Sequence, residues 1–408
     1  MARAESALGR VFELARDYIA THRDRPVWPL TSLEALRRAL NGPLPAEPAS
    51  DFDVVEQLAR AAEPGLVATA GPRYFGFVTG GALPATVAAD WLASAWDQNA
   101  GLFVMSPAAA VVEEVAGAWL LELLGLPATA SVAFVTGCHM ANFTALAAAR
   151  HELLRRAGWD VEADGLQAAP GLRVIVGDEV HVSVVGALRM LGIGSRQLVR
   201  VAADDQGRMR TSALAAALAE SDGPTIVCAQ AGNVNTGAFD PFVAIADLCA
   251  ERRAWLHVDG AFGLWAAASD ALRHHVRGVE RADSWARGFA VYAALQSLGR
   301  RGVADLVDRC CRLARRFADR LSADDRVQIL NEVALNQVLV RVAPSGGDPD
   351  VATDCALGAV QEERICWLGG TTWHGMRAMR ISVSNWSTTE EDVDRSAESI
   401  LGAVRRQS

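Results

Sequence analysis

The sequence predicts an α/β protein, with a mostly parallel sheet and a smaller α+β domain in its C-terminal part. From about residue 85, helical segments alternate with short apolar runs. Strands that are apolar on both faces are typical of a parallel sheet that helices cover on both sides. After about residue 310 the order of elements changes. We therefore expect an N-terminal helical segment (1–60), a large α/β domain (61–305) and a small α+β domain (306–408).

The first sixty residues predict a helix, a loop and a second helix. Apolar residues recur at helical spacing from Leu8 to Ile19, and prolines at positions 26, 29, 43 and 45 then break the pattern. The first helix packs either on its own domain or on a second subunit, and the sequence leaves both arrangements open.

The central part predicts alternating strands and helices. A helix should begin at Ser106-Pro107 and end at Gly125, because proline favours a first helical turn and glycine a C-terminal cap. The expected strands are 132–135, 173–176, 198–201, 225–228 and 255–258. The expected helices between most of them are 142–157, 182–191, 211–219 and 241–252.

The C-terminal part predicts a compact α+β domain. A helix (311–321) precedes two β-rich runs (327–330 and 335–342), and a further helix (350–363), a strand (378–384) and a last helix (390–405) follow.

Composition and charge narrow the function classes. Acidic residues outnumber basic ones by 48 to 39, a balance opposite to that of nucleic-acid-binding proteins. No apolar run reaches the roughly 18 residues of a membrane helix, and the first residues lack the apolar core of a signal peptide. The seven cysteines lie at irregular spacing without a C-x-x-C pair, which favours buried thiols over disulfides or a metal site. We therefore expect a cytoplasmic protein without a bound metal.

The sequence contains no lysine, so that all 39 basic residues are arginine. Lysine is the side chain that forms a Schiff base with an aldehyde, so that no side chain of this chain can form one.

Small and polar residues follow the first two predicted strands, at the sheet edge where ligands of parallel sheets bind. Gly137 and Cys138 lead from the first strand into a helix, whose free N–H groups suit a phosphate, although an ordinary strand-to-helix turn is the alternative. His181 follows the second strand and is either a stacking or acid–base group or a structural histidine.

Two later strand ends are also polar. The stretch 230–240 contains Asn235 and Thr236 and is too rich in Asn and Gly to be core. Asp259 ends a buried strand and is followed by Gly260 and Ala261, which leave a flat space for a ring-shaped ligand. A buried carboxylate needs a cationic partner, although Asp259 could instead cap a helix.

In this order the motifs resemble those of group II pyridoxal 5′-phosphate (PLP)-dependent decarboxylases, of the aromatic-L-amino-acid and glutamate decarboxylase type. The resemblance runs from about Pro72 to near the C-terminus. It rests on Pro72-Arg73-Tyr74-Phe75-Gly76, Thr136-Gly137 through Asn142, Asp178 with His181, His257-Val258-Asp259-Gly260-Ala261, Ala282-Asp283-Ser284, and Arg380-Ile381-Ser382 through Asn385. It implies the aspartate aminotransferase-like fold of PLP-dependent transferases (fold type I).

The resemblance also implies roles for single residues. Gly137 and Cys138 match the turn that holds the cofactor phosphate, and His181 matches the imidazole stacked on the pyridine ring. Asp259 matches the carboxylate that keeps the ring nitrogen protonated, and Ala261 packs against the ring. Asn235 and Thr236 fall in a loop near the cofactor. His181 and Asp259 are the expected catalytic residues.

The sequence departs from the family where the family carries its lysine. After Asp-Ser the family has a His-Lys pair whose lysine holds PLP covalently, followed by a mobile loop with a tyrosine. Here Ala286 runs directly into Arg287, and the following residues resemble the family well downstream of that lysine. We expect the intervening segment, with one or two strands, to be absent. PLP would then be held without a covalent bond, if it is bound at all.

Three functions remain open. The chain is an impaired or inactive amino-acid decarboxylase, a pseudoenzyme that binds PLP or a partner and regulates, or an enzyme that uses non-covalently bound PLP. A nucleotide-binding dehydrogenase is disfavoured, because no G-x-G-x-x-G follows a strand.

The sequence gives little information about the substrate. Tyr74, Phe75 and Trp96 favour an aromatic or bulky L-amino acid, with core or interface packing as the alternative. Arg380 is either a structural ion-pair partner or a clamp for the substrate carboxylate. By resemblance, the active site would lie at a homodimer interface.

Overall fold

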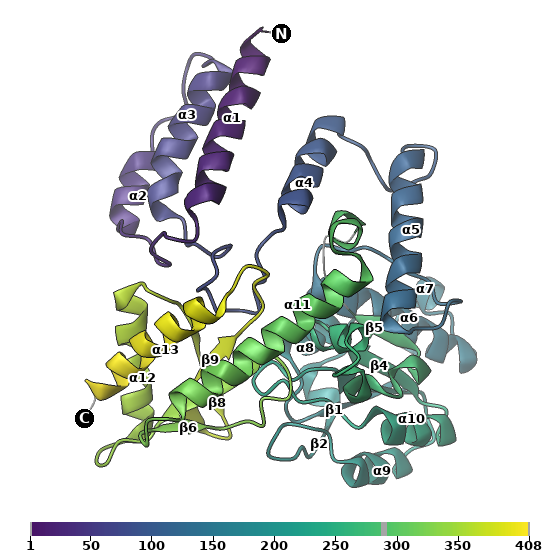
Figure 1. Ribbon diagram of the computed structural model, residues 1–408. Coiled ribbons are helices and arrows are strands. Elements are labelled where there is room, and N and C mark those ends of the chain that lie inside the picture. The colour runs from purple at the N-terminus through teal and green to yellow at the C-terminus, as the bar shows by residue number, and fades with distance from the viewer. Residues whose placement is uncertain (1, 287–291, 407–408) are drawn as a thin grey trace. The chain divides into compact units, whose positions relative to one another are not determined.

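The computed structural model describes residues 2–286 and 292–406, which fall into two compact units (Figure 1). The large unit comprises Leu83–Arg312 and Asn331–Gln337, and the small unit comprises Met1–Ala82, Leu313–Leu330 and Val338–Ser408. The N-terminal helices thus group with the C-terminal segments. The division into 1–60, 61–305 and 306–408 stays a prediction.

The large unit is built on a five-stranded sheet in the order β2-β1-β3-β4-β5, and every neighbouring pair is parallel. The strands are β1 (Arg173–Gly177), β2 (Leu198–Val201), β3 (Thr225–Gln230), β4 (Trp255–Asp259) and β5 (Ser284–Ala286). The predicted parallel sheet is therefore confirmed.

Helices pack on both faces of this sheet. On one face, alternate strand residues such as Ile175 and Val227 pack with Leu214 of α9 (Thr211–Ala219). On the other, Val176 and its neighbours pack with Leu146 of α6 (Cys138–Arg156). The remaining helices of this unit are α4 (Pro84–Trp96), α5 (Pro107–Leu124, capped by Gly125), α7 (Val161–Asp164), α8 (Val182–Met190) and α10 (Phe242–Glu251), with short 3-10 turns at 195–197, 263–268, 273–276 and 279–281.

One expectation for this sheet was wrong, and one strand was not predicted. Residues 132–135 do not form a strand, because an apolar run becomes a strand only where a neighbour accepts its backbone hydrogen bonds, and no ladder reaches it within the described chain. Conversely, Ser284–Ala286 pairs with β4 although its three residues are too few for a periodic signal. Residues 287–291, where the sequence predicts the shortened junction, lie outside the described residues.

The small unit combines an N-terminal helical group with a four-stranded sheet. The first sixty residues form α1 (Ala2–Thr21), α2 (Leu33–Leu40) and α3 (Asp51–Ala62), so that a third helix lies where only a loop was predicted. A 3-10 turn (Glu63–Gly65) follows α3. Ser32 accepts a hydrogen bond from the N–H of Ala35, which explains how α2 begins between two proline-rich breaks.

The sheet of the small unit has the order β6-β7-β9-β8, with antiparallel β6–β7 and β8–β9 pairs. Its strands are β6 (Val327–Ile329), β7 (Gln337–Val342), β8 (Gly369–Trp373) and β9 (Met376–Ser382), of which β8 was not predicted. The helices are α12 (Pro349–Glu363), α13 (Glu390–Arg405) and the last turns of α11 (Tyr292–Leu321), whose residues up to Arg312 belong to the large unit. Gly299, at φ 61°, breaks α11 into two helical stretches, and only the end of the second one, 311–321, was predicted. No helix of the described residues is long and apolar enough to cross a membrane.

Candidate active site

The carboxylate of Asp259 lies at the carboxyl end of β4, between the ends of two parallel neighbours. Asp259 is 6% exposed. Its Oδ1 accepts hydrogen bonds from the backbone N–H of Ala261 at 3.2 Å and from the thiol of Cys138 at 3.7 Å, and its Oδ2 accepts one from Nδ2 of Asn142 at 3.3 Å. The structure thus brings three sequence-predicted residues, Asp259, Ala261 and Cys138, together.

Burial dominates the electrostatics of Asp259. It raises the pKa of this carboxyl above its usual value, and the N–H of Ala261, Asn142, the nearby His181 and Cys138 lower the pKa only part of the way back. A carboxylate offers about four acceptor positions, so that these three donors leave capacity for another. A protonated ring nitrogen is a donor that would offset the cost of burying this charge.

The N-terminus of α6 is open to an anion. Gly137 precedes the helix with φ 157° and, as a glycine, offers no capping side chain of its own. A Cβ placed on Gly137 would meet nothing within 4 Å, so that space adjoins the turn. The positive end of the helix dipole at this turn suits a phosphate, which is the ligand that the sequence predicts for Gly137 and Cys138.

His181 caps α8 and faces the same site. Its Nδ1 accepts a hydrogen bond from the N–H of Ser183 at 3.3 Å and lies 2.7 Å from Oγ of Ser183. His181 also contributes electrostatically to Asp259, by lowering the pKa of that carboxyl. The structure therefore gives His181 a local hydrogen-bonding role, while stacking on a ring stays a prediction.

Asn235 and Thr236 lie in the buried turn that follows β3. Both backbone N–H groups donate to Oδ1 of Asn233, at 2.9 and 3.3 Å. The hydroxyl of Thr236 donates to the carbonyl of Gln206 at 2.7 Å and accepts from the N–H of Ala238 at 3.2 Å. The structure thus shows these residues shaping the turn, and their contact with a cofactor stays a prediction.

Asn142 and His257 are polar residues of the site to which the sequence alone assigned no role. Both are completely buried. Oδ1 of Asn142 lies 3.0 Å from Nε2 of His257, and burial lowers the pKa of His257 to about 3. Strand periodicity was the available signal, because His257 lies two residues before Asp259 and hence on the same face of β4.

The remaining sequence-predicted residues lie elsewhere. In the small unit, the Tyr74 ring stacks on Trp367 with centroids 5.0 Å apart, and Phe75 is 1% exposed with its ring edge-on to Phe317 at 4.9 Å. Arg380 lies on β9, where burial lowers its pKa. Trp96, in the large unit, ends α4 and is 64% exposed. Their roles toward a substrate stay predictions.

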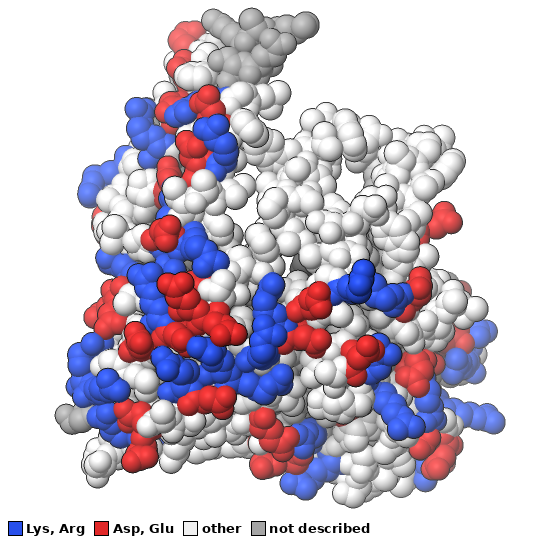
Figure 2. Space-filling model, in the orientation of Figure 1, with Lys and Arg blue, Asp and Glu red and all other residues white. Residues whose placement is uncertain are grey.

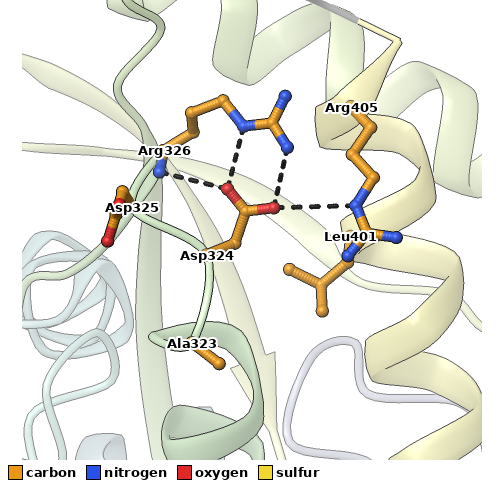
Figure 3. A pocket seen from close by; sticks show the side chains of 6 residues that line it. All are labelled: Ala323, Asp324, Asp325, Arg326, Leu401 and Arg405. Atoms are coloured by element: carbon orange, nitrogen blue, oxygen red, sulfur yellow. Dashed lines mark hydrogen bonds and ion pairs between the residues drawn. The ribbon is translucent and has the colours of Figure 1, made fainter.

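A separate pocket of about 460 Å³ lies in the small unit (Figure 3). Its side chains largely neutralise one another: Asp324 accepts hydrogen bonds from Nε and Nη2 of Arg326, both at 2.8 Å, and lies 3.7 Å from Nε of Arg405. The hydrogen bonds from Arg326 lower the pKa of Asp324 to about 2. The pocket contains none of the predicted site residues, and we do not assign the active site to it. Its lining residues are Ala323, Asp324, Asp325, Arg326, Leu401 and Arg405.

Known structures share this fold. The crystal structure of Oryza sativa TDC with PLP and tryptamine matches with a TM-score of 0.90 at 22% identity, over 100% of this chain and 98% of that chain. The crystal structure of mouse CSAD in apo form matches with a TM-score of 0.88 at 22% identity, over 99% and 98%. At this identity the likeness establishes the fold, which is that of fold type I PLP-dependent decarboxylases.

Sequence relatives lead to the same family. Tryptophan decarboxylase 1 of Oryza sativa subsp. japonica is 32% identical over 297 residues, 68% of this chain and 57% of that protein. The aromatic-L-amino-acid decarboxylase of Bacillus atrophaeus is 31% identical over 276 residues, 67% and 55% respectively. The chain thus spans about half the length of the curated relatives it matches. Residues 34–288 match the pyridoxal-dependent decarboxylase conserved domain. The chain belongs to the pyridoxal-dependent decarboxylase family, whose cofactor is PLP.

Proposed function

We propose that this chain binds PLP without a covalent bond and that its decarboxylation of an L-amino acid is slight or absent. The proposal rests on one combined observation, a site that suits PLP in a chain that cannot bind it covalently. The buried Asp259 carboxylate, the N-terminus of α6 and His181 lie close together, in a chain whose sequence contains no lysine.

The residues present fit the cofactor. The Asp259 carboxylate would accept a hydrogen bond from the ring nitrogen, and the raised pKa of this carboxyl indicates that a cationic partner would lower the cost of its burial. The N–H groups that begin α6 after Gly137 would hold the phosphate. His181 would stack on the ring, and Ala261 would pack against it. We carry these assignments over from the family resemblance and from the contacts described above.

When bound, PLP supplies an electron sink for the bond that breaks at the substrate Cα. The chain's own part is to keep that sink effective. Asp259 would hold a proton at the ring nitrogen, and His181 would fix the plane of the ring. The chain lacks the lysine amine that captures the aldehyde in the family, so that affinity rests on these polar and stacking contacts alone. Binding should therefore be reversible.

The substrate we propose is an aromatic L-amino acid. Two relatives are, by name, a tryptophan decarboxylase and an aromatic-L-amino-acid decarboxylase. Tyr74, Phe75 and Trp96 are the aromatic side chains that the sequence predicts to select such a substrate, and Phe75 could act only through its neighbours, because it is buried against Phe317.

A homodimer is part of the proposal. Figure 2 shows a largely uncharged face over α4 and α5 of the large unit. Its exposed apolar side chains are Trp91, Leu92, Trp96, Leu102, Phe103, Val104, Met105, Val111 and Val112. Exposed apolar patches of this extent mark interaction sites, and a second copy of this chain is the partner we propose. This surface is compatible with both functions, a homodimeric decarboxylase and the alternative, in which a catalytically inactive chain regulates by dimerising.

The cytoplasm is the compartment we propose, because all seven cysteines, each within the described part of the chain, are thiols rather than disulfides.

The experiment is a decarboxylation assay with radiolabelled carboxyl groups. The purified protein is supplied with excess PLP and a panel of aromatic and acidic L-amino acids, and a group II decarboxylase serves as positive control. We expect release of labelled CO₂ near background while PLP binding is detectable by isothermal titration calorimetry. Turnover at an ordinary enzymatic rate would refute the impairment, and absence of PLP binding would refute the assigned site.

A further inference from the structure

Asn142 is the hub of a hydrogen-bond network around Asp259. It lies on α6 and is completely buried. Its Nδ2 donates to Oδ2 of Asp259 at 3.3 Å and to Oγ of Ser183 at 3.2 Å, and its Oδ1 lies 3.0 Å from Nε2 of His257. The side-chain amide therefore uses both its N–H groups and its oxygen within the site.

The carboxylate fixes the orientation of this amide. With the amide rotated by 180°, its oxygen would face the Asp259 oxygen and two acceptors would meet. Because Oδ1 of Asn142 must accept, Nε2 of His257 must carry a proton. Burial lowers the pKa of His257 to about 3, so that the ring is neutral at pH 7 and Nδ1 is bare.

The chain of donors continues beyond His257. Bare Nδ1 accepts the hydroxyl proton of Ser284 at 3.0 Å, and Oγ of Ser284 in turn accepts the indole N–H of Trp255 at 2.9 Å. Each hydrogen bond from Trp255 through Ser284, His257 and Asn142 thus donates in the direction of Asp259. Aligned donors in a buried chain polarise one another and favour the anionic form of the terminal acceptor.

A branch of the network reaches the imidazole of His181. The backbone N–H of Ser183 donates to Nδ1 of His181, which identifies Nδ1 as an acceptor. The hydroxyl of Ser183, which accepts from Asn142, lies 2.7 Å from the same Nδ1 and so links the amide to the imidazole.

We propose that Asn142 is a positioning residue that holds the Asp259 carboxylate ionised and aimed at the ring nitrogen of a vitamin B6 phosphate, and that it couples this carboxylate to His181 through Ser183. His257, Ser284 and Trp255 serve to fix the orientation of Asn142. The inference rests on the proposed function for the identity of the ligand, but the network itself is a property of the ligand-free chain.

Binding of pyridoxamine 5′-phosphate, measured by calorimetry, tests the proposal, because this probe needs no lysine. Asn142→Asp keeps the size of the side chain and its acceptor toward His257, but it replaces the donor to Asp259 with a second carboxyl group. We expect affinity at pH 8 to fall by about ten- to a hundredfold, since a hydrogen bond to a buried charge is lost. Gln197→Glu is the matched control: it makes the same chemical change at an exposed residue and retains the acceptor for the N–H of Gly194. The control should bind within twofold of wild type.

The pH profile separates positioning from a merely structural role. Two carboxyl groups in contact share a proton at moderate pH, and the protonated carboxyl that Asn142→Asp introduces can again donate to Asp259. The deficit of this variant relative to wild type should therefore shrink between pH 8 and pH 5.5. The titratable neighbours of Asp259 are Cys138, His181, His257 and Cys228, and they are the same in both proteins. A deficit that does not change with pH, or unchanged affinity at pH 8, would overturn the proposal.

A second readout needs no ligand. Nitrogen-15 NMR of the ligand-free wild type should show His257 neutral and protonated on Nε2 down to pH 5. Carbon-13 titration should place the Asp259 pKa higher in Asn142→Leu than in wild type, because a donor to the anion is lost. A His257 proton on Nδ1, or an unchanged Asp259 pKa, would overturn the inference. If neither Asn142 variant folds, the tautomer of His257 in wild type and in Ser284→Ala decides the inference. A His257 proton on Nε2 in both proteins would support it, and a proton on Nδ1 would overturn it. Failure of wild type to bind pyridoxamine 5′-phosphate would refute the proposed function instead, and these NMR results would still decide the role of Asn142.

Discussion

Asp259→Asn should separate cofactor binding from folding. Asp259 accepts hydrogen bonds from Ala261, Cys138 and Asn142, and asparagine keeps an oxygen that can accept from one side of this group. The cost to folding is thus limited to about one neutral hydrogen bond, or roughly 1 kcal/mol. The substitution also removes a buried negative charge, and this change favours folding.

The sign of that relief follows from the raised pKa of Asp259. Because the folded-state pKa exceeds the unfolded value, the unfolded chain loses this proton first, and the ionised group opposes folding above its folded pKa. At pH 7 the free energy of unfolding of the asparagine variant should therefore lie within about 1 kcal/mol of the wild-type value. Its affinity for PLP should fall by about 3 kcal/mol, or roughly a hundredfold, because a charged hydrogen bond in a buried site is lost.

Urea unfolding and calorimetric titration with PLP measure the two quantities on the same preparation. Gln197→Asn, on the exposed surface, serves as a control for handling and should alter neither. A variant that binds PLP as tightly as wild type would show that Asp259 does not meet the ring nitrogen. A variant that is destabilised by several kcal/mol without a change in affinity would show that the carboxylate is structural.

Three further predictions concern other parts of the chain. Arg73→Met should destabilise the protein by about 3 kcal/mol in urea unfolding, because the side chains of Arg73 and its ion-pair partner Asp392 are only 4% and 5% exposed. The control Arg16→Met, which removes an exposed ion pair, should cost less than about 0.5 kcal/mol. A change of Trp96→Glu should convert a dimer into a monomer in light scattering, and a wild-type monomer would contradict the proposed interface. Arg380→Ala should lower the unfolding midpoint while leaving the stabilisation by added PLP and aromatic amino acid intact; loss of that stabilisation with folding preserved would identify a carboxylate clamp instead.

The elements that could be predicted are those whose pattern is local. The strands β1, β2, β3 and β4 are apolar runs between helical segments, and their sequence alone indicates a buried parallel sheet. Residues 132–135 have the same apolar pattern but no neighbouring strand with which to pair in the described chain. Pairing depends on what lies beside a segment rather than on its composition. The three-residue β5 is the reverse case, because its neighbour β4 makes it a strand.

The site shows the same limit. Asp259 and the turn at Gly137 could be predicted, because Asp259 ends a buried strand, Gly137 leads into a helix, and each is a recognisable residue type at that place. Asn142 could not, because it meets Asp259 across 117 residues of sequence and is one polar residue in an otherwise ordinary helix. Only the packing of α6 on the sheet reveals that its amide lies against the carboxylate.

The central claim is that this site holds PLP without a covalent bond, and comparison of two ligands tests it most directly. Calorimetric titration of the wild-type protein with PLP and with pyridoxamine 5′-phosphate should give affinities within a few-fold of each other, because Asp259 and the α6 N-terminus act on the ring nitrogen and the phosphate that both share. After borohydride reduction, mass spectrometry should find no pyridoxyl group on any peptide. Binding of PLP far tighter than of the amine, a pyridoxyl-modified peptide, or no binding of either ligand would contradict the account.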